Sequence, residues 1–257
     1  MYVAMDMDRD TSPFVRDAGG QPMTKNPLKD VRVRKALSYA INRQAIIDRV
    51  LEGAGTIAGN LLPAGFEGTS PNIKPDPFDP ARAKALLKEA GYPQGFQLTL
   101  HATNDRYPND DKVAQAIAQM WARIDVKTEI ETQPNATFFT QAARQNFSVM
   151  AAQYGSSDIS MIYRALVHSY DKERNLGSAN RTRHSSPKAD EIVREALRTM
   201  EPERRSEQFA RASEVALRED QIINLLYYPQ YVYASRANLA VVPHADGRFL
   251  AHFIERK

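Results

Sequence analysis

Apolar residues recur with a helical period of about 3.6 residues in some parts of the chain and alternate with polar residues in others. The first helical stripe contains Val33, Leu37 and Ile47, and Asp30 precedes it as a capping residue. This pattern predicts one helix from residue 30 to about residue 51. The same reasoning predicts further helices at residues 79–90, 109–124, 135–143, 160–167, 186–200 and 201–220.

Short apolar runs and period-two alternation predict strands at residues 2–7, 97–102, 126–131, 147–153, 222–228 and 231–235. Strands alternate with helices through the middle of the chain, which is typical of βαβ units. We therefore expect an α/β fold with a mixed, partly parallel sheet flanked by helices. Two segments without a period are predicted to be irregular, namely a Gly- and Pro-rich crossing at residues 54–78 and a polar loop at residues 169–186.

The composition narrows the class of protein. The 257 residues are 42% hydrophobic and 25% charged, as in an ordinary soluble globular protein. The net charge of +3 comes from 34 basic and 31 acidic residues, too even a balance to favour nucleic acid or a membrane as a partner. Cysteine is absent, no apolar run reaches the ~20 residues of a membrane span, and residues 1–13 lack a signal-peptide pattern.

No motif for nucleotide binding or acyl transfer stands in its required context. Gly53, Gly55 and Ala58 come near the G-x-G-x-x-G spacing, but they follow a predicted helix rather than a strand. The G-x-S-x-G elbow of hydrolases does not occur. We therefore expect no catalytic residue and no cofactor.

The residues that could hold a metal also lack the necessary spacing. The H-x-x-x-H pattern is missing from the five histidines, which are His101, His168, His184, His244 and His252. Asp6, Asp8 and Asp10 are spaced like the start of a calcium loop. However, Thr11 and Asp17 occupy the positions that require glycine and glutamate. We expect no metal site.

Two loops carry candidate ligand-binding side chains: Arg106 and Tyr107 in the first, and Tyr154, Ser156, Ser157 and Asp158 in the second. Each loop follows a predicted strand, and ligands of open α/β sheets bind beyond the carboxyl ends of the strands. In such a cleft a tyrosine can stack on a ligand, a serine can donate a hydrogen bond, and Asp158 can pair with an amine. The alternative is that the tyrosines simply cover the end of the sheet.

Several motifs occur together in one order. Residues 30–37 and 40–43 read DVRVRKAL and AINR, and residues 79–92 read DPARAKALLKEAGY. With residues 104–131, 180–190 and 204–223, these segments resemble the carboxyl-terminal lobe (lobe II) of family 5 extracellular solute-binding proteins. Members of that family are the peptide-, nickel- and glutathione-capturing receptors of bacterial ABC importers.

The resemblance implies that residues 1–257 form a single lobe of a type II periplasmic-binding-protein fold. Residues 1–29 would then lie near the hinge, and the tail at residues 241–257 would belong to the missing amino-terminal lobe. The chain also opens inside a predicted strand, so we expect an upstream half to be absent.

The resemblance further implies a periplasmic receptor, not an enzyme, that closes by hinge motion on a peptide or peptide-like solute and delivers it to an inner-membrane ABC permease. A single lobe supplies only part of the ligand contacts. We therefore expect this chain to fold by itself and to bind solute weakly or not at all. Two alternatives are a stand-alone, hydrolase-like α/β enzyme that uses Asp158, and a protein-interaction module.

Some of the matched residues have roles in the family. Peptide-binding relatives anchor the ligand's amino group with a tryptophan and an aspartate three residues later; here Tyr154 and Ser157 occupy those positions, with Asp158 one residue further on. Asn180 and Arg181 fall in the matching N-R motif and are also candidate ligand-binding residues. Asp125 stands at a left-handed turn position that usually holds glycine.

The arginines of the first motif, Arg32, Arg34 and Arg43, are predicted to tie the first helix to carboxylates or carbonyls.

Overall fold

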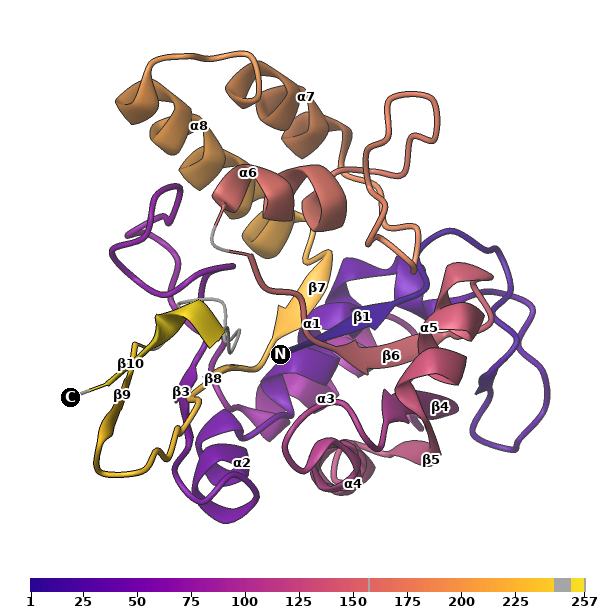
Figure 1. Ribbon diagram of the computed structural model, residues 1–257. Helices are drawn as coiled ribbons and strands as arrows, with labels where there is room; N and C mark the ends of the chain where they lie inside the picture. The colour runs from indigo at the N-terminus through magenta and orange to yellow at the C-terminus, as the bar shows by residue number, and fades with distance from the viewer. Residues whose placement is uncertain (157, 243–250, 257) are drawn as a thin grey trace.

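The computed structural model describes residues 1–156, 158–242 and 251–256, which form a central sheet with helices on both faces (Figure 1). The helices are α1 (Val31–Tyr39), α2 (Arg43–Arg49), α3 (Pro80–Glu89), α4 (Asp110–Ala122), α5 (Asn135–Ala143), α6 (Ile159–Ile162), α7 (Pro187–Ala196) and α8 (Pro202–Glu214). The strands are β1 (Tyr2–Met5), β2 (Val15–Arg16), β3 (Gly55–Ile57), β4 (Phe96–Thr103), β5 (Val126–Gln133), β6 (Val149–Ala152), β7 (Ile223–Leu225), β8 (Tyr227–Pro229), β9 (Leu239–Val241) and β10 (Ile254–Arg256). Within this described part of the chain, no helix has the length and apolar character needed to cross a membrane.

The main sheet contains both parallel and antiparallel strand pairs, as predicted. Its order is β2-β4-β6-β1-β7, and β5 pairs with β4. β4 runs parallel to β5 and to β6, whereas β1 runs antiparallel to β6 and to β7. The carboxyl ends of β4, β5, β6 and β7 therefore lie at the same edge of the sheet as the amino end of β1.

Each face of the sheet has its own hydrophobic core, because successive strand residues point to opposite faces. In β1, Val3 and Met5 pack with α1 to α4, whereas Tyr2 and Ala4 pack with α5 to α8. Burial on both sides explains why the central strands read as continuous apolar runs rather than as alternating patterns.

The prediction of one helix from residue 30 to residue 51 is wrong, because the chain breaks into α1 and α2. The side chain of Asp30 caps α1 by accepting from the Arg32 amide. The side chain of Asn42 caps α2 by accepting from the Ala45 amide at 2.9 Å. The apolar pattern continues across the break because both helices pack against the same core.

The carboxyl-terminal strands also differ from the prediction. The predicted strand at residues 222–228 divides into β7, in the main sheet, and β8, which pairs with β3 in a separate two-stranded sheet. β3 lies inside the crossing that was expected to be irregular. Residues 231–235 form no strand in the described structure, so that prediction is wrong. An extended, apolar segment becomes a strand only where a partner edge is available.

The arginines of the first two helices bind carboxylate and carbonyl groups, as predicted. Arg32 donates to both carboxylate oxygens of Asp30. Arg34 donates to the backbone carbonyls of Leu28, Asp220 and Gln221, and Arg43 to those of Leu225 and Ser38. Burial lowers the pKa of Arg34 and of Arg43 to about 10, so both remain charged at neutral pH.

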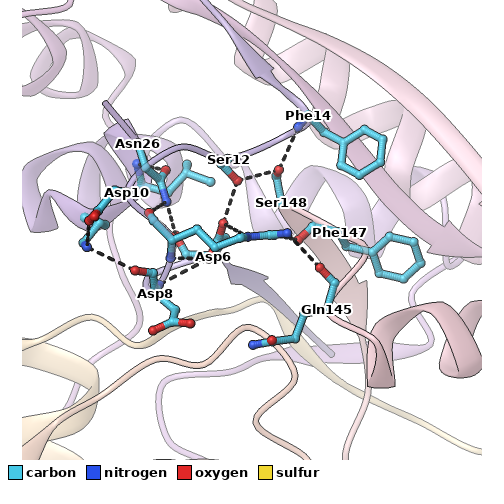
Figure 2. Close-up of polar contacts among 12 residues, drawn as sticks. Asp6, Asp8, Asp10, Ser12, Phe14, Asn26, Gln145, Phe147 and Ser148 are labelled. Atoms are coloured by element: carbon cyan, nitrogen blue, oxygen red, sulfur yellow. Dashed lines mark hydrogen bonds and ion pairs between the residues drawn. The ribbon is translucent and has the colours of Figure 1, made fainter. Parts of the chain in front are cut away.

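A polar network ties the segment after β1 to the start of β6 (Figure 2). The carboxylate of Asp6 accepts from Arg9 Nε and from the Ser12 hydroxyl, each at 2.7 Å. The Arg9 guanidinium also donates to the carbonyl of Gln145 at 2.9 Å. The Ser12 hydroxyl lies 2.6 Å from that of Ser148. The Arg9 and Ser12 donors share Oδ2 of Asp6. Oδ1 accepts from the backbone amides of Asp8 at 3.2 Å and Arg9 at 3.3 Å, so both carboxylate oxygens are used inside the protein.

Asp10, whose spacing from Asp6 and Asp8 is like that at the start of a calcium loop, pairs with Lys29 at 2.9 Å, and this hydrogen bond lowers the pKa of the Asp10 carboxyl. Among residues 1–156, 158–242 and 251–256, no group of three or more His, Asp or Glu side chains is placed to hold a metal ion. The carboxylates of Asp6 and Asp10 serve as partners of local donors.

Asp125 adopts the left-handed conformation predicted for it, with φ of 64°. Its carboxylate also pairs with Lys84 at 2.9 Å across the surface. We expect Asp125→Gly to be more stable than Asp125→Ala by about 1 kcal/mol, because only alanine keeps the steric cost of a Cβ in this conformation. Both variants lose the Lys84 pair, so urea unfolding of the two isolates the backbone effect. Equal stabilities would show that the backbone relaxes at this turn.

Candidate functional site

A cavity of about 140 Å³, called here the tyrosine cavity, lies beyond the carboxyl edge of the main sheet. It is lined by Met1, Tyr2, Ala58, Leu61, Leu62, Pro63, Gln153, Tyr154, Gly155, Ser156, Ile162, Leu166, Leu225, Tyr227, Tyr228, Pro229 and Tyr231. Strand pairing assembles it: Tyr2 lies opposite Ala152 on one side and Leu225 on the other. The loops after β6 and β7 therefore leave the sheet next to each other, at the edge where α/β proteins bind ligands.

The loops that follow β4 and β6 meet at this edge. The Tyr107 hydroxyl lies 3.3 Å from both the amide nitrogen and the carbonyl oxygen of Gln153, the residue before Tyr154. Arg106 is exposed, with its guanidinium carbon 5.9 Å from the centroid of the Tyr107 ring. Arg106 and Tyr107 therefore stand beside the tyrosine cavity without lining it.

Tyr154 and Ser156 line the cavity itself. Burial raises the pKa of the Tyr154 hydroxyl, and the charge of Arg181 acts in the opposite direction. The hydroxyl is therefore neutral at physiological pH and can donate a hydrogen bond. The Ser156 hydroxyl accepts from the amide of Asp158 at 3.1 Å.

Asp158 lies outside the cavity lining and caps α6, accepting from the Ser160 amide at 2.8 Å. Its side chain is exposed to solvent. Ser157, the other residue of this predicted motif, lies outside the described residues. In the second predicted loop, Tyr154 and Ser156 therefore line the cavity, whereas Asp158 begins α6.

Asn180 and Arg181 line a different pocket. Asn180 is buried and its side-chain amide donates to the carbonyls of His168 and His184. It therefore ties together two segments of the loop between α6 and α7. The guanidinium of Arg181 lies over the Phe139 ring, 4.8 Å from its centroid. The structure does not bring these two side chains into the tyrosine cavity.

Much of the cavity wall comes from residues that the sequence patterns did not single out. Leu61, Leu62 and Pro63 come from the crossing between α2 and α3. The Tyr228 hydroxyl fixes that segment by bonding to the carbonyls of Asn60 at 2.6 Å and Leu62 at 2.8 Å. Burial raises the pKa of Tyr228 to about 12. The run YYPQY at residues 227–231 is the sequence signal that could have identified this wall.

The chemistry of the cavity suits binding. Aromatic rings and leucines can enclose an apolar group, and the Gln153 side chain, which donates to the Tyr231 hydroxyl at 2.9 Å, supplies polar contacts near the rim. The described residues of the lining offer mainly hydroxyl, amide and apolar groups.

The sequence is similar to a known protein family and to several proteins with known ligands. Residues 2–173 match the family described as bacterial extracellular solute-binding proteins, family 5 Middle. Heme-binding protein A of Haemophilus influenzae is 33% identical over 196 residues, which are 73% of this chain and 35% of that protein. The dipeptide-binding protein of Escherichia coli is 43% identical over 111 residues, which are 42% of this chain and 21% of that protein.

A solved structure shares the fold along the whole chain. The dipeptide-binding protein of Pseudoalteromonas sp. SM9913, in complex with Met-Leu, superposes with a TM-score of 0.81 at 22% identity. The match covers 100% of this chain and 48% of that one. The chain thus spans at most about a third of these two curated relatives and about half of this structure.

Proposed function

The chain belongs to the family 5 bacterial extracellular solute-binding proteins, and from this premise we propose that it is the ligand-binding lobe of an ABC-importer receptor for peptides or peptide-like solutes. Proteins of this family bind solutes and are not enzymes, so the alternative of a hydrolase-like enzyme is wrong. The tyrosine cavity at the carboxyl edge of the sheet is the observation that supports the proposal.

The size and lining of the cavity favour a peptide-like solute. A volume of about 140 Å³ suits a single apolar side chain of a solute. Tyrosine hydroxyls and amides can bond to peptide groups while leucines hold an apolar side chain. Two of the similar proteins above carry the name dipeptide-binding protein.

We assign roles to the residues around the cavity on the basis of their chemistry. Tyr154 stacks on the solute and Ser156 bonds to it. Arg106, whose guanidinium is exposed beside Tyr107, pairs with a solute carboxylate. Asp158 keeps an exposed carboxylate that can accept a solute amine while it caps α6.

In this proposal the chain works together with a second lobe, to which residues 1–29 and 241–257 lead. Solute contacts made by both lobes favour the closed state over the open one, because a ligand shifts an equilibrium only by its differential affinity. The closed receptor then docks on an inner-membrane permease from the periplasmic side.

A thermal-shift screen tests the proposal. The samples are this chain alone and a longer polypeptide in which a complementary second lobe is joined to it, each with di- to hexapeptides, glutathione, nickel chelates, hemin and sugars. Binding to the native state raises the unfolding midpoint by mass action. We expect a peptide to stabilise the longer polypeptide and to have little effect on the isolated chain. Equal shifts in both, or stabilisation by sugars alone, would contradict the proposal.

Replacing the stacking residue should weaken binding. We expect Tyr154→Ala to raise the Kd for the stabilising peptide by about tenfold, because aromatic contacts contribute about 0.5–1.5 kcal/mol beyond the area they bury. Isothermal titration measures the change. Phe78→Ala removes an exposed aromatic ring outside the cavity and should leave the Kd unchanged. The same Kd for Tyr154→Ala and the unmodified protein would remove Tyr154 from the site.

A further inference from the structure

A second pocket, called here the basic pocket, lies in the loop between α6 and α7 and has a volume of about 260 Å³. Three cationic side chains line it: Lys172, Arg181 and Arg183. It shares no lining residue with the tyrosine cavity, so the two pockets are separate candidate binding sites.

The two guanidinium groups are held by aromatic rings rather than by hydrogen bonds. Arg183 lies over Tyr170, with its guanidinium carbon 3.3 Å from the ring centroid, and Arg181 lies over Phe139 of α5 at 4.8 Å. Stacking orients a guanidinium plane and leaves its N–H donors available. Across the described residues, the side chains of Lys172, Arg181 and Arg183 have no hydrogen-bond or ion-pair partner.

The pocket has a net positive charge. Asp171 is its only acidic lining residue, and it is already paired with Arg174 at 2.7 Å. This hydrogen bond lowers the pKa of the Asp171 carboxyl. The three cations of the lining are therefore left without a counter-charge from residues 1–156, 158–242 and 251–256.

The wall of the pocket is held in place by backbone contacts. Asp171 and Leu176 exchange two backbone hydrogen bonds of 3.0 and 2.9 Å. The Gly177 amide donates to the carbonyl of Arg164 at 2.8 Å. A Cβ at Gly177 would lie 2.7 Å from the carbonyl oxygen of His168, so the close turn requires glycine. The loop that carries these cations is consequently held in one backbone conformation before any ligand arrives.

We propose that the basic pocket binds a phosphate group, carried either by a free solute or by a lipid headgroup. Two planar guanidinium forks and an ammonium match the several acceptor oxygens of one oxyanion. An anion would supply the partner that these cations lack. The site is separate from the proposed solute site, so it holds or fails independently of the transport function.

Binding of inorganic phosphate to the purified chain tests the site. The titration is made by calorimetry in a phosphate-free buffer, with sodium chloride at matched ionic strength as the reference. We expect saturable binding that is weakened about tenfold by Arg181→Gln, by Arg183→Gln and by Lys172→Gln, because each removes a charged donor. Lys172 is exposed, so its replacement cannot act by unfolding the loop.

Lys88→Gln is the matched control, since it removes one charge from α3 on the opposite face of the sheet. Its affinity for phosphate should equal that of the unmodified protein. Sedimentation with phosphatidylglycerol and phosphatidylcholine vesicles distinguishes the sources. If the protein sediments only with phosphatidylglycerol vesicles and inorganic phosphate releases it, the ligand is a lipid headgroup. If the protein binds phosphate but sediments with neither kind of vesicle, the ligand is a free solute. The proposal would be overturned if the protein bound neither phosphate nor phosphatidylglycerol vesicles saturably. It would also be overturned if Arg183→Gln bound phosphate as tightly as the unmodified protein.

Discussion

We expect Asp76→Ala to lower the free energy of unfolding by about 3–5 kcal/mol, the usual cost of removing one partner of a buried ion pair. The side chain of Asp76 is 5% exposed and that of Arg43 is 3% exposed. Loss of the carboxylate would leave the buried Arg43 without a counter-charge. Urea unfolding followed by circular dichroism measures the change.

The contacts around Asp76 explain the size of this effect. The carboxylate accepts from the Ser38 hydroxyl at 2.5 Å and from the Gln221 amide at 2.9 Å, and it pairs with Arg43 and Arg218. Burial alone would raise the pKa of Asp76, but the hydrogen bond from Ser38 and the charges of Arg218 and Arg43 outweigh it and lower the pKa. The network joins α1, the crossing before α3 and the segment after α8.

A matched surface pair provides the control. Arg82 and Glu89 lie 2.7 Å apart on α3, and both side chains are about half exposed. Exposed pairs contribute about 0–1 kcal/mol, so Glu89→Ala should have a small effect. If Asp76→Ala cost no more than Glu89→Ala, water would have to enter the network and solvate Arg43.

The second large effect concerns pH. We expect the free energy of unfolding to fall by about 3 kcal/mol as the pH decreases from 7 to 4, owing to His184. His184 is fully buried and its Nε2 lies 3.1 Å from the carbonyl oxygen of Val167, whereas its Nδ1 has no hydrogen-bond partner among the residues that the structure describes. Burial lowers the pKa of His184 to about 4 from 6.5.

The unfolding free energy falls with decreasing pH because the unfolded chain takes up a proton that the folded chain does not. Between pH 6.5 and about pH 4, the unfolded chain binds a proton at this histidine and the folded chain does not. Protons therefore favour unfolding in this window. The stabilising effect of the neutral ring is complete above pH 6.5 and declines as the pH falls toward 4. Burial also lowers the pKa of His101, which shifts the stability in the same direction.

Comparison with His184→Gln isolates the contribution of this residue, because glutamine does not titrate. Chemical unfolding of both proteins at several pH values gives two stability curves. Their difference should change by about 3 kcal/mol between pH 7 and pH 4. Parallel curves would show that His184 is protonated in the folded protein at the same pH as in the unfolded chain.

Local signals predicted most helices and strands. Asp79 and Asp30 cap α3 and α1 as expected, because a cap depends only on side-chain and amide groups within three residues. The helix at residues 135–143 forms as predicted without a side-chain cap, and Asp125 adopts the predicted left-handed conformation. The break at Asn42 was missed because α1 and α2 share one core, so the apolar period continues through it.

The candidate site was predicted only where it follows a strand. Tyr154 and Ser156 reach the tyrosine cavity because β4 and β6 are parallel and end at one edge. Leu61 and Leu62 gave no periodic signal, since their position depends on a hydrogen bond from Tyr228, 166 residues away from Leu62. Asp158 was expected as an amine partner, a role that stays a prediction, and the fold also uses it as a helix cap.

The sequence by itself determined the fold class, the start of most helices and the family of the protein. These properties depend on periodicity, on caps and on ordered motifs, which act between neighbours along the chain. Only the tertiary structure decided which loops enclose the tyrosine cavity, which cations gather in the basic pocket and which partners Asp76 has. Those arrangements depend on packing between residues far apart in the chain. A local sequence pattern does not predict which distant residues come into contact.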